Sequence, residues 1–564
     1  MPHPDNPLIV QSDFSVLLEV NSPLFREVRD RISSFLELEK SPEMFYTYRL
    51  NAVSLWNGFA SGLTDRTVIN ILNKYIKYPL PATVKYFIEE YYLNYGIFKL
   101  DKYDAKYLKV SCDDNELLQD ISYARQIENY VYRRMEDYFL IKNETRGVFK
   151  LAMIYLNYPV DDRVGYLKFE SYPIGLRRHN TFHIRNYQQE ALKAFYNRHD
   201  PGGGAGVIVL PCGSGKTIVG LAAMAEYSTK TLIITPNIVA LRQWRSELLD
   251  KTSLTEADIG EYSGECKEIK PVTITTYQIL IYRKNKNEDF IHFNIFYRNN
   301  WGFIIYDEIH LLPAPVFKAI ASIQAVRRLG LTATLVREDH KEKDVFSLVG
   351  PKKFDVPWKA LESDAYIAEA LCYEIRVPMS DAQLTEYFES SDRMKFRIAS
   401  ENRNKTDYLA YLLENLTGHN ILIIGQYINQ LSYIAAKFDL NLITGKTDNA
   451  TRQDLYKKFR ESRIRKLVVS KVANFAIDLP DADVAIQISG TFGSRQEEAQ
   501  RLGRILRPKP GDNRAYFLNI ITADSKEEFF AQNRKRFLMG QGYKYNVISG
   551  FQQLKELVPS IVTH

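Results

Sequence analysis

The sequence is poor in cysteine and has no long apolar run. Its four cysteines, Cys112, Cys212, Cys266 and Cys372, are far apart in the 564 residues, and none forms a Cys-x-x-Cys pair. This usage argues against a zinc site or a cysteine-ligated iron–sulfur cluster and suits a reducing compartment. No apolar run approaches about 18 residues, the length that a membrane-spanning helix needs. The first residues do not read as a secretory signal, so we expect a cytoplasmic protein with no membrane segment.

Charge of one sign is not strongly in excess, and we find no internal repeat or low-complexity tract. The chain has 74 basic and 68 acidic residues, a formal net charge of +6. That excess permits nucleic-acid binding without demonstrating it. Hydrophobic residues make up 45% of the chain and charged residues 25%, as in globular proteins. The length predicts about three or four domains.

One stretch has the features of a phosphate-binding loop. Residues 210–217 read Leu-Pro-Cys-Gly-Ser-Gly-Lys-Thr, after an apolar run and before a helical pattern. The segment Gly213, Ser214, Gly215 would let the backbone approach an anion where the N–H groups of a helix start are free. The first glycine of the usual pattern is Leu210 here, which changes the subclass of the loop rather than its identity.

Four side chains around this loop are predicted to hold a nucleotide. Lys216 would reach the β- and γ-phosphates of ATP, and Thr217 would offer its hydroxyl to Mg²⁺. An Arg-x-Tyr-Gln element upstream contains Arg185 and Gln188. The amide of Gln188 can both donate to and accept from the edge of adenine. ATP with Mg²⁺ is therefore the expected ligand.

A second element places two carboxylates directly after an apolar strand. Asp307 would hold the water shell of Mg²⁺, and Glu308 would orient and activate the attacking water. Two acids after a strand are more often a solvated turn, but the phosphate-binding loop upstream favours the catalytic role. His310, Thr332 and Thr334 follow strands of the same region and are expected to couple the nucleotide site to a second lobe.

Strands and helices alternate in the middle and in the last third of the chain, which predicts doubly wound parallel sheets. The expected fold class is α/β, with two doubly wound parallel-sheet lobes preceded by smaller α+β domains. Ligands bind such sheets beyond the carboxyl ends of the strands. The predicted domains are residues 1–100, 104–178, 180–362 and 363–564.

Three further segments are interpreted from their local pattern. Residues 25–39 carry the spacing of a helix. A second helix is expected at 128–137, where Tyr130, Tyr132, Arg133 and Arg134 would suit phosphate contacts and base stacking. A solvated helix face is the alternative. The basic run at 534–536 is interpreted as a solvated helix.

Taken together, the motifs resemble those of superfamily 2 helicases. Four segments are similar to motifs I, II, III and VI of that superfamily: residues 213–217, 307–310, 332–334 and 500–507. The triplet Arg337, Glu338, Asp339 resembles the Arg-Glu-Asp element of the xeroderma pigmentosum group B (XPB) helicases. Further stretches resemble the same family in its bacterial form: residues 7–13, 54–57, 475–480 and 490–500.

The resemblance implies an ATP-dependent DNA helicase or translocase that moves 3′ to 5′. Gln500, Arg504 and Arg507 would then face the γ-phosphate, where guanidinium groups stabilise transition-state charge. Asp478 would belong to the nucleotide site, and Arg337 and its two acidic neighbours would serve strand separation. The resemblance also implies that both lobes are RecA-like and that the second lobe contains the family's thumb as a short insertion near 380–402. It further implies that 1–100 is the family's N-terminal domain and that 104–178 is its small damage-recognition domain.

The expected partner is DNA, whether single-stranded, duplex or forked, held mainly by its backbone. A nuclease or another repair protein is a candidate partner, and we expect a monomer. One alternative is a translocase that remodels protein–DNA complexes without separating strands. Another is an assembly factor whose ATPase acts as a conformational switch. The XPB-like elements make an RNA helicase a weaker alternative.

Overall fold

In the computed structural model the chain forms two compact units. The first contains Met1–Leu210 and Gly215–Val356, and the second contains Pro211–Ser214 and Pro357–His564. The structure describes residues 3–32, 34–40, 44–60, 62–165, 169–177, 183–196, 204–284, 291–292, 294–313, 316, 326–333, 345, 348–356, 358–470, 482–491, 495–503, 505–509 and 513–562. Within these ranges, no helix combines the length and the apolar character that crossing a membrane requires.

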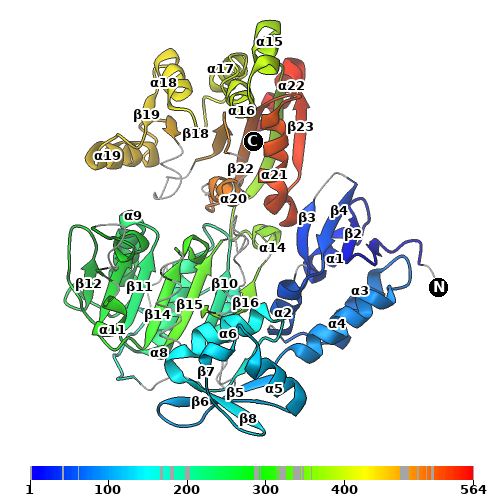
Figure 1. Ribbon diagram of the computed structural model, residues 1–564. Coiled ribbons are helices and arrows are strands. Elements are labelled where there is room, and N and C mark those ends of the chain that lie inside the picture. Colours follow the sequence, from blue (N-terminus) through cyan, green and yellow to red (C-terminus); the bar gives the residue numbers. More distant parts are fainter. Residues whose placement is uncertain are drawn as a thin grey trace. The chain divides into compact units, whose positions relative to one another are not determined.

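The first unit begins with an antiparallel sheet of order β1-β2-β4-β3 that is accompanied by four helices (Figure 1). The strands are β1 (Leu8–Val10), β2 (Ser15–Glu19), β3 (Glu37–Lys40) and β4 (Phe45–Arg49). The helices are α1 (Phe25–Ile32), α2 (Ala52–Ala60), α3 (Asp65–Tyr75) and α4 (Ala82–Asn94). The helix predicted at 25–39 is therefore wrong in its second half. The chain leaves α1 because residues 37–40 pair with β4, a contact that local periodicity does not reveal.

A five-stranded sheet of order β7-β8-β6-β5-β9 follows. Its strands are β5 (Phe98–Lys102), β6 (Tyr107–Cys112), β7 (Val131–Arg134), β8 (Tyr138–Lys142) and β9 (Asp161–Asp162). The helical segments are α5 (Asn115–Tyr123), η1 (Glu128–Tyr130), η2 (Asn143–Thr145) and α6 (Arg146–Tyr155). The helix predicted at 128–137 is wrong, because residues 131–134 pair with β8. The sheet also starts earlier than the predicted boundary at 104, because all five residues of β5 pair with β6.

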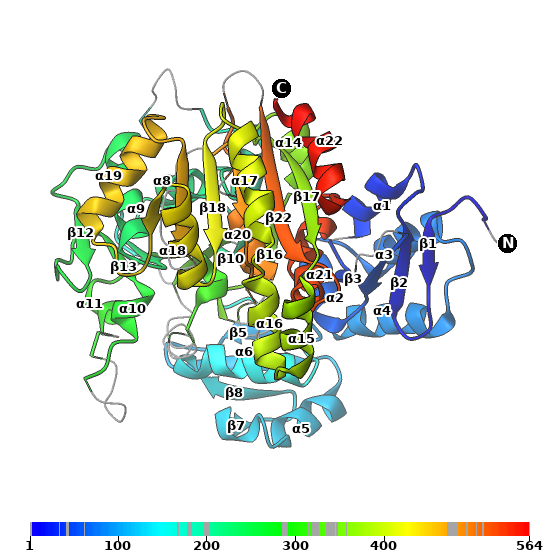
Figure 2. The same ribbon diagram turned by 90° about the horizontal axis from the view of Figure 1, so that it is seen from above.

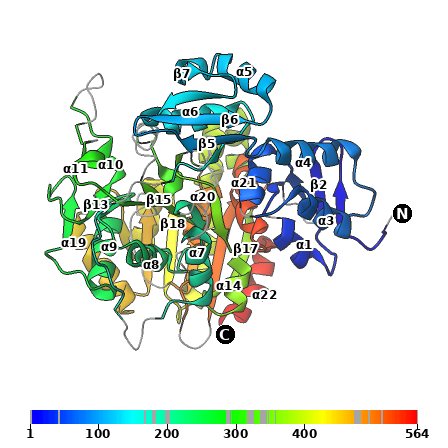
Figure 3. The ribbon, with the colours of Figure 1, turned by 90° about the horizontal axis from the view of Figure 1, so that it is seen from below.

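The rest of the first unit is a seven-stranded parallel sheet of order β12-β13-β11-β14-β15-β10-β16. Its strands are β10 (Ala205–Val209), β11 (Thr231–Thr235), β12 (Ile259–Tyr262), β13 (Val272–Thr276), β14 (Phe303–Asp307), β15 (Arg327–Thr332) and β16 (Lys352–Asp355). The helical segments described here are α7 (Asn186–Tyr196), α8 (Lys216–Tyr227), α9 (Ile238–Lys251), α10 (Tyr277–Leu280), α11 (Ile295–Arg298) and η3 (Ile309–Leu311). Figure 3 shows α8 and α9 next to each other, and both pack on the sheet. Strands such as β11 are buried along their whole length, as expected where a parallel sheet is covered on both faces.

The second unit contains another seven-stranded parallel sheet, of order β19-β20-β18-β21-β22-β17-β23. Its strands are β17 (Glu369–Val377), β18 (Ile421–Gly425), β19 (Asn441–Ile443), β20 (Lys466–Ser470), β21 (Val484–Gln487), β22 (Arg514–Thr522) and β23 (Tyr545–Ser549). Its helices are α14 (Trp358–Ser363), α15 (Asp381–Glu389), α16 (Asp392–Ser400), α17 (Lys405–Asn415), α18 (Ile428–Lys437), α19 (Asn449–Arg460), α20 (Arg495–Gly503), α21 (Lys526–Gly540) and α22 (Gly550–Val562). Figure 2 shows α17 lying along this sheet. The two parallel α/β lobes and the smaller domains before them confirm the predicted fold class.

The basic run at 534–536 does not form a solvated helix face. Arg534 and Lys535 lie in α21 and are buried, with exposed fractions of 0% and 5%. Lys535 pairs with Glu374 of β17 at 2.5 Å, and Arg534 lies 3.4 Å from Glu498 of α20. The prediction failed because both acidic partners are distant in sequence.

Candidate active site

The segment predicted to bind phosphate lies between β10 and α8, as its sequence indicates. The backbone N–H of Leu210 donates to the carbonyl oxygen of Thr332 at 2.9 Å, which ties the loop to the end of the neighbouring strand β15. Gly213 and Gly215 have φ angles of +78° and +80°, a region that only glycine enters without strain. Ser214 is buried and its hydroxyl donates to the carbonyl of Pro211 at 2.6 Å. The loop therefore has the backbone geometry that its sequence predicts.

Gln188 lies against this loop from α7. A Cβ atom at Gly215 would stand 2.6 Å from Nε2 of Gln188, so glycine is needed there for a second reason. The Gln188 side chain is buried, and its Oε1 accepts from the backbone N–H of Arg185 at 2.9 Å. The Arg185 guanidinium in turn donates to the Tyr187 hydroxyl at 3.3 Å. The two residues predicted to contact the base are thus held together beside the loop.

The two carboxylates stand at the carboxyl end of β14. Asp307 is its last residue, and Glu308 adopts a left-handed conformation with φ +49° and ψ +56°, which directs the chain into η3. Oε1 of Glu308 lies 3.5 Å from Nζ of Lys216, and its Oε2 lies 3.4 Å from Nδ1 of His310. His310 is buried, and its Nδ1 is 2.6 Å from the Thr332 hydroxyl oxygen. These contacts connect Lys216, Glu308, His310 and Thr332 in one series.

Asp307 occupies an environment that disfavours its charge. Burial, and next the negative charge of Glu308, raise the pKa of Asp307 to about 6, whereas the Trp244 N–H and the Lys216 ammonium act in the opposite direction. The indole Nε1 of Trp244 donates to Oδ2 of Asp307 at 3.0 Å. The Tyr277 hydroxyl donates to the backbone oxygen of Asp307 at 3.0 Å. A cation near this carboxylate would favour its charged form.

The topology explains why these residues meet. β14, β15 and β10 are neighbours in the sheet, and each ends at the same edge with one of the polar motifs. Thr217 lies in the first turn of α8.

The remaining predicted residues divide into two groups. Thr334, Arg337, Glu338, Asp339, Asp478 and Arg504 lie outside the described residues. Gln500 lies in α20 and Arg507 follows that helix, so both belong to the second unit.

Sequence reasoning missed Trp244 and gave no role to Tyr277. A tryptophan within an amphipathic helix reads as an ordinary core residue, and no local pattern shows that its N–H points to a carboxylate 63 residues away. Tyr277 follows a buried strand in the same way as the motifs that were found, and that position was the available signal.

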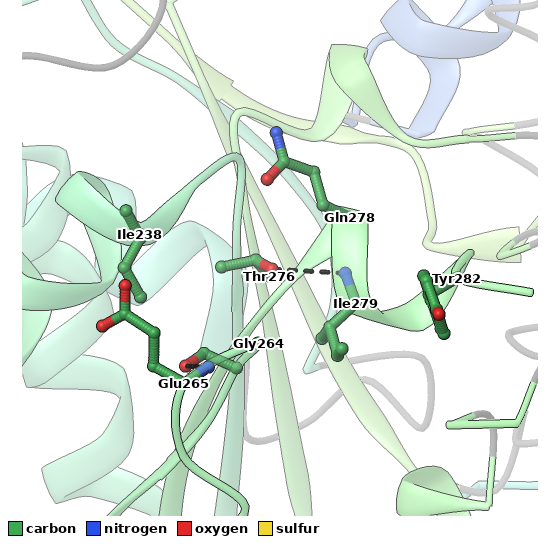
Figure 4. Close-up of a pocket in the computed structure, with 8 residues that line it drawn as sticks. Ile238, Gly264, Glu265, Thr276, Gln278, Ile279 and Tyr282 are labelled. Atoms are coloured by element: carbon green, nitrogen blue, oxygen red, sulfur yellow. Dashed lines mark hydrogen bonds between the residues drawn. The ribbon is translucent and has the colours of Figure 1, made fainter. Parts of the chain in front are cut away.

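The first unit also has a pocket of about 300 Å³ near the carboxyl ends of β12 and β13. Figure 4 shows most of its lining residues, which are Ile238, Ser263, Gly264, Glu265, Thr276, Gln278, Ile279 and Tyr282. Helix α9 starts here, where Oδ1 of Asn237 accepts from the N–H groups of Val239 and Ala240, both at 3.0 Å. The pocket thus combines polar side chains with a helix start.

Family comparisons match most of the chain. Residues 361–563 match the family described as ERCC3/RAD25/XPB C-terminal helicase. Residues 8–136 match a helicase conserved C-terminal domain, and residues 181–337 match the res subunit of type III restriction enzymes.

Full-length relatives agree with these matches. A Kineococcus radiotolerans protein named DNA 3′-5′ helicase XPB is 46% identical over 545 residues, which cover 96% of each chain. A Mycobacterium tuberculosis protein of the same name is 45% identical over 542 residues, covering 96% of this chain and 97% of the other. The Saccharomyces cerevisiae protein named general transcription and DNA repair factor IIH helicase/translocase subunit XPB/SSL2 is 28% identical over 621 residues, covering 98% of this chain and 73% of the other. With such identity over nearly its whole length, and with helicase motifs at the edge of its first parallel sheet, the chain belongs to the XPB family of superfamily 2 DNA helicases.

Proposed function

We propose that this protein uses ATP hydrolysis to move 3′ to 5′ along DNA and to separate its strands during repair or a related DNA transaction. The observation that carries the proposal is the series Lys216, Glu308, His310 and Thr332 at the carboxyl edge of the first parallel sheet. In this series Lys216 would contact the phosphates and Glu308 would hold the attacking water. The buried His310 links Glu308 to Thr332 at the end of β15. The use of ATP agrees with the helicase family of the chain.

The residues present fit ATP with a divalent cation. Gly213 and Gly215 have left-handed backbone conformations, and a side chain at Gly215 would clash with Gln188. Lys216 follows directly. Asp307 offers a carboxylate whose charged form burial disfavours, so a cation would stabilise it. We therefore assign Mg²⁺ to Thr217 and Asp307. When bound, Mg²⁺ would neutralise negative charge on the phosphates.

We assign the chemical step to Glu308. Its carboxylate lies between Lys216 and His310, 3.5 and 3.4 Å from their nitrogen atoms. The phosphates of ATP would become the counter-ions of Lys216, and Glu308 could then orient the attacking water and accept its proton. His310 would transmit the state of Glu308 to Thr332 at the end of β15. We assign Gln188 and Arg185 to the adenine base.

We further propose that the second unit supplies the groups that stabilise transition-state charge. Gln500, Arg504 and Arg507 are the candidates, because they fall in the segment that resembles motif VI. Asp478 is proposed to complete the nucleotide site. Arg337, Glu338 and Asp339 are proposed to act in strand separation, and the two helices α15 and α16 to form the thumb.

The small domain that contains the five-stranded sheet is proposed to bind DNA. One face of this sheet, which we call the aromatic face, carries Tyr103, Tyr107, Lys109, Tyr132 and Tyr138. The rings of Tyr107 and Tyr132 stack with centroids 4.2 Å apart, and Nζ of Lys109 lies 4.5 Å from the Tyr138 ring centroid. Tyr103 and Tyr132 have exposed fractions of 52% and 53%. Exposed rings with a cation on the same face suit stacking on bases and contact with phosphates. Damage recognition is the specific role that we propose for this domain.

The aromatic face can be tested in the full-length protein. Replacing both Tyr107 and Tyr132 by Ala should weaken binding to forked DNA by roughly tenfold or more, since base stacking contributes about 1–3 kcal/mol per base. Tyr123→Ala is the matched control, because that tyrosine is 61% exposed in the same domain but contacts Arg134 instead. If the two variants bind forked DNA with equal affinity, the aromatic face does not bind DNA and the proposal is wrong.

The pocket beside α9 is proposed as a second contact for the DNA backbone. Thr276 and Gln278 contribute a hydroxyl and an amide to its lining, and such groups commonly bind phosphate oxygens. Glu265 also lines it, but its charge is offset by Arg242 at 3.1 Å.

The test of the main proposal is Lys216→Ala. We expect this variant to lose DNA-stimulated, Mg²⁺-dependent ATP hydrolysis, because it lacks the point charge on the β- and γ-phosphates. Lys230→Ala is the control, since Lys230 lies in the same lobe and pairs with exposed Glu170 at 3.6 Å. Undiminished turnover in the Lys216 variant would overturn the assignment.

Two comparisons separate the proposal from its alternatives. A strand-displacement assay distinguishes a helicase from a translocase that leaves the duplex intact. ATP consumption that rises with DNA length distinguishes a motor from an assembly switch. Several eukaryotic relatives are named as subunits of a general transcription and DNA repair factor, which supports a repair protein as a partner.

A further inference from the structure

Trp244 connects the two halves of the nucleotide site. It lies in the middle of α9 with an exposed fraction of 2%, and its Nε1 donates to Oδ2 of Asp307 at 3.0 Å. Its ring packs on Gly220 of α8, the helix that begins with Lys216. One side chain therefore touches both the phosphate-loop helix and the carboxylate assigned to the cation.

There is no room for a side chain at Gly220 beside this ring. A Cβ atom at Gly220 would lie 2.6 Å from Cη2 and 3.3 Å from Cζ3 of Trp244. Glycine within a helix is less favourable than alanine, so its presence here accommodates the ring. Helix α8 thus fixes the position of the ring, and the N–H of the ring fixes the position of the Asp307 carboxylate.

A hydrogen bond to one carboxylate oxygen fixes the rotation of the group about its Cβ–Cγ bond. Asp307 is also held through its backbone oxygen by the Tyr277 hydroxyl. With Oδ2 bonded to the indole, Oδ1 is the oxygen that Asp307 would offer to the cation. Groups that orient a cation-holding carboxylate in this way contribute substantially to cation affinity.

We propose that Trp244 is a positioning residue that orients Asp307 toward Mg²⁺ and keeps this carboxylate in register with the phosphate-binding loop. This inference rests on the proposed function, since it takes Asp307 as the residue for the cation. The proposal predicts that the indole N–H increases the affinity for nucleotide when Mg²⁺ is present, and that it has little effect when Mg²⁺ is absent.

Trp244→Phe removes the N–H together with the five-membered ring and keeps a six-membered aromatic ring. Trp301→Phe is the matched control, because Trp301 is 1% exposed in the same lobe and its Nε1 donates to the Ile295 carbonyl at 2.7 Å. Both variants lose one buried indole hydrogen bond, but Trp301 is not placed in the nucleotide site. Each full-length protein is titrated calorimetrically with a non-hydrolysable ATP analogue, once with Mg²⁺ and once with EDTA, and its melting temperature is recorded.

For Trp244→Phe we expect the analogue to bind about 10- to 100-fold more weakly with Mg²⁺, and as in the wild type with EDTA. The Mg²⁺ concentration for half-maximal ATPase should rise by a similar factor, with kcat near wild type at saturating Mg²⁺. Trp301→Phe should show a wild-type Mg²⁺ dependence. A similar Mg²⁺ response in both variants, or a change in melting temperature alone, overturns the proposal.

Gly220→Ala gives a second measurement, which decides the matter if Trp244→Phe does not fold. It keeps the N–H but displaces the ring, so Mg²⁺-dependent binding of the analogue should weaken while binding in EDTA stays unchanged. Unchanged binding in both conditions overturns the proposal. If the wild type itself binds the analogue equally with Mg²⁺ and with EDTA, the assignment of Asp307 fails, and this outcome is distinct from a failure of Trp244 alone.

Discussion

Replacing Lys405 by methionine should destabilise the second unit far more than the same change in an exposed ion pair. Lys405 is fully buried at the start of α17, and its Nζ donates to both carboxylate oxygens of Glu527, at 2.8 and 2.7 Å, and to the Ile488 carbonyl at 2.9 Å. Burial lowers the pKa of Lys405, while the Glu527 charge raises it. Methionine fills the space of the lysine stem but leaves a carboxylate buried without its cation. Breaking such a pair on one side costs about 3–5 kcal/mol.

The control is Lys458→Met in α19 of the same unit. Lys458 pairs with Asp454 at 2.7 Å, but the two side chains are 44% and 55% exposed. Exposed pairs of this kind contribute less than about 1 kcal/mol. Hydrogen exchange followed by mass spectrometry resolves the difference locally, because a loss of about 3 kcal/mol accelerates exchange through opening roughly 150-fold. The peptides to follow are those of α17, β21 and α21.

A double variant tests whether the pair itself is responsible. Glu527→Gln keeps an acceptor for the Thr522 N–H, which donates to Oε2 of Glu527 at 2.9 Å, but removes the charge. Lys405→Met with Glu527→Gln should therefore be less destabilised than the sum of the two single variants. Additive losses, or a Lys405→Met variant no less protected than Lys458→Met, would refute the reasoning.

Three further outcomes are expected. Glu308→Gln should still bind ATP but hydrolyse it about 10²- to 10⁴-fold more slowly, because an amide cannot accept the proton of water; an unchanged kcat with a raised KM would make Glu308 a binding residue. Arg337→Ala should keep most DNA-stimulated ATPase and lose unwinding of a forked duplex in the same buffer, whereas equal loss of both would place the triplet in the nucleotide site. Gly215→Ala should weaken ATP binding measured by calorimetry, because its φ of +80° and the Gln188 amide 2.6 Å from the added carbon both oppose a side chain; undiminished affinity would contradict this.

The parallel lobes were predictable because their signals are local. A buried strand such as β11 is an apolar run, and the polar residues that follow β14 and β15 fall where parallel strands end. Because β14 and β10 flank β15 in the sheet, Glu308 and Lys216 come together at one edge, 3.5 Å apart, although they are far apart in sequence. Topology thus converts a local pattern into a site.

The errors occurred where a segment takes its structure from a distant partner. Residues 131–134 form a strand because β8 pairs with them, and residues 37–40 because β4 does. Neither segment has an alternation strong enough to override a helical interpretation. The contact between Trp244 and Asp307 also depends on a distant partner, because the sequence of a helix does not show which carboxylate its indole will contact.

Buried charge is the other feature that sequence alone could not reveal, and it bears on the helix that resembles motif VI. In α20, Glu498 and Arg501 are three positions apart and have exposed fractions of 0% and 1%. Gln487 of β21 bonds to both, donating to Glu498 at 3.1 Å and accepting from Arg501, and Arg534 of α21 lies 3.4 Å from Glu498.

These contacts hold α20 by directed polar bonds rather than by apolar packing alone. Hydrogen bonds weaken steeply when their angles change, so a rotation of α20 about its axis would break several at once. Apolar contacts would tolerate such a rotation better. If Gln500 and the arginines that follow it act on the γ-phosphate, as we propose, their reach depends on this rotation, and the buried network then supports the chemistry by fixing it.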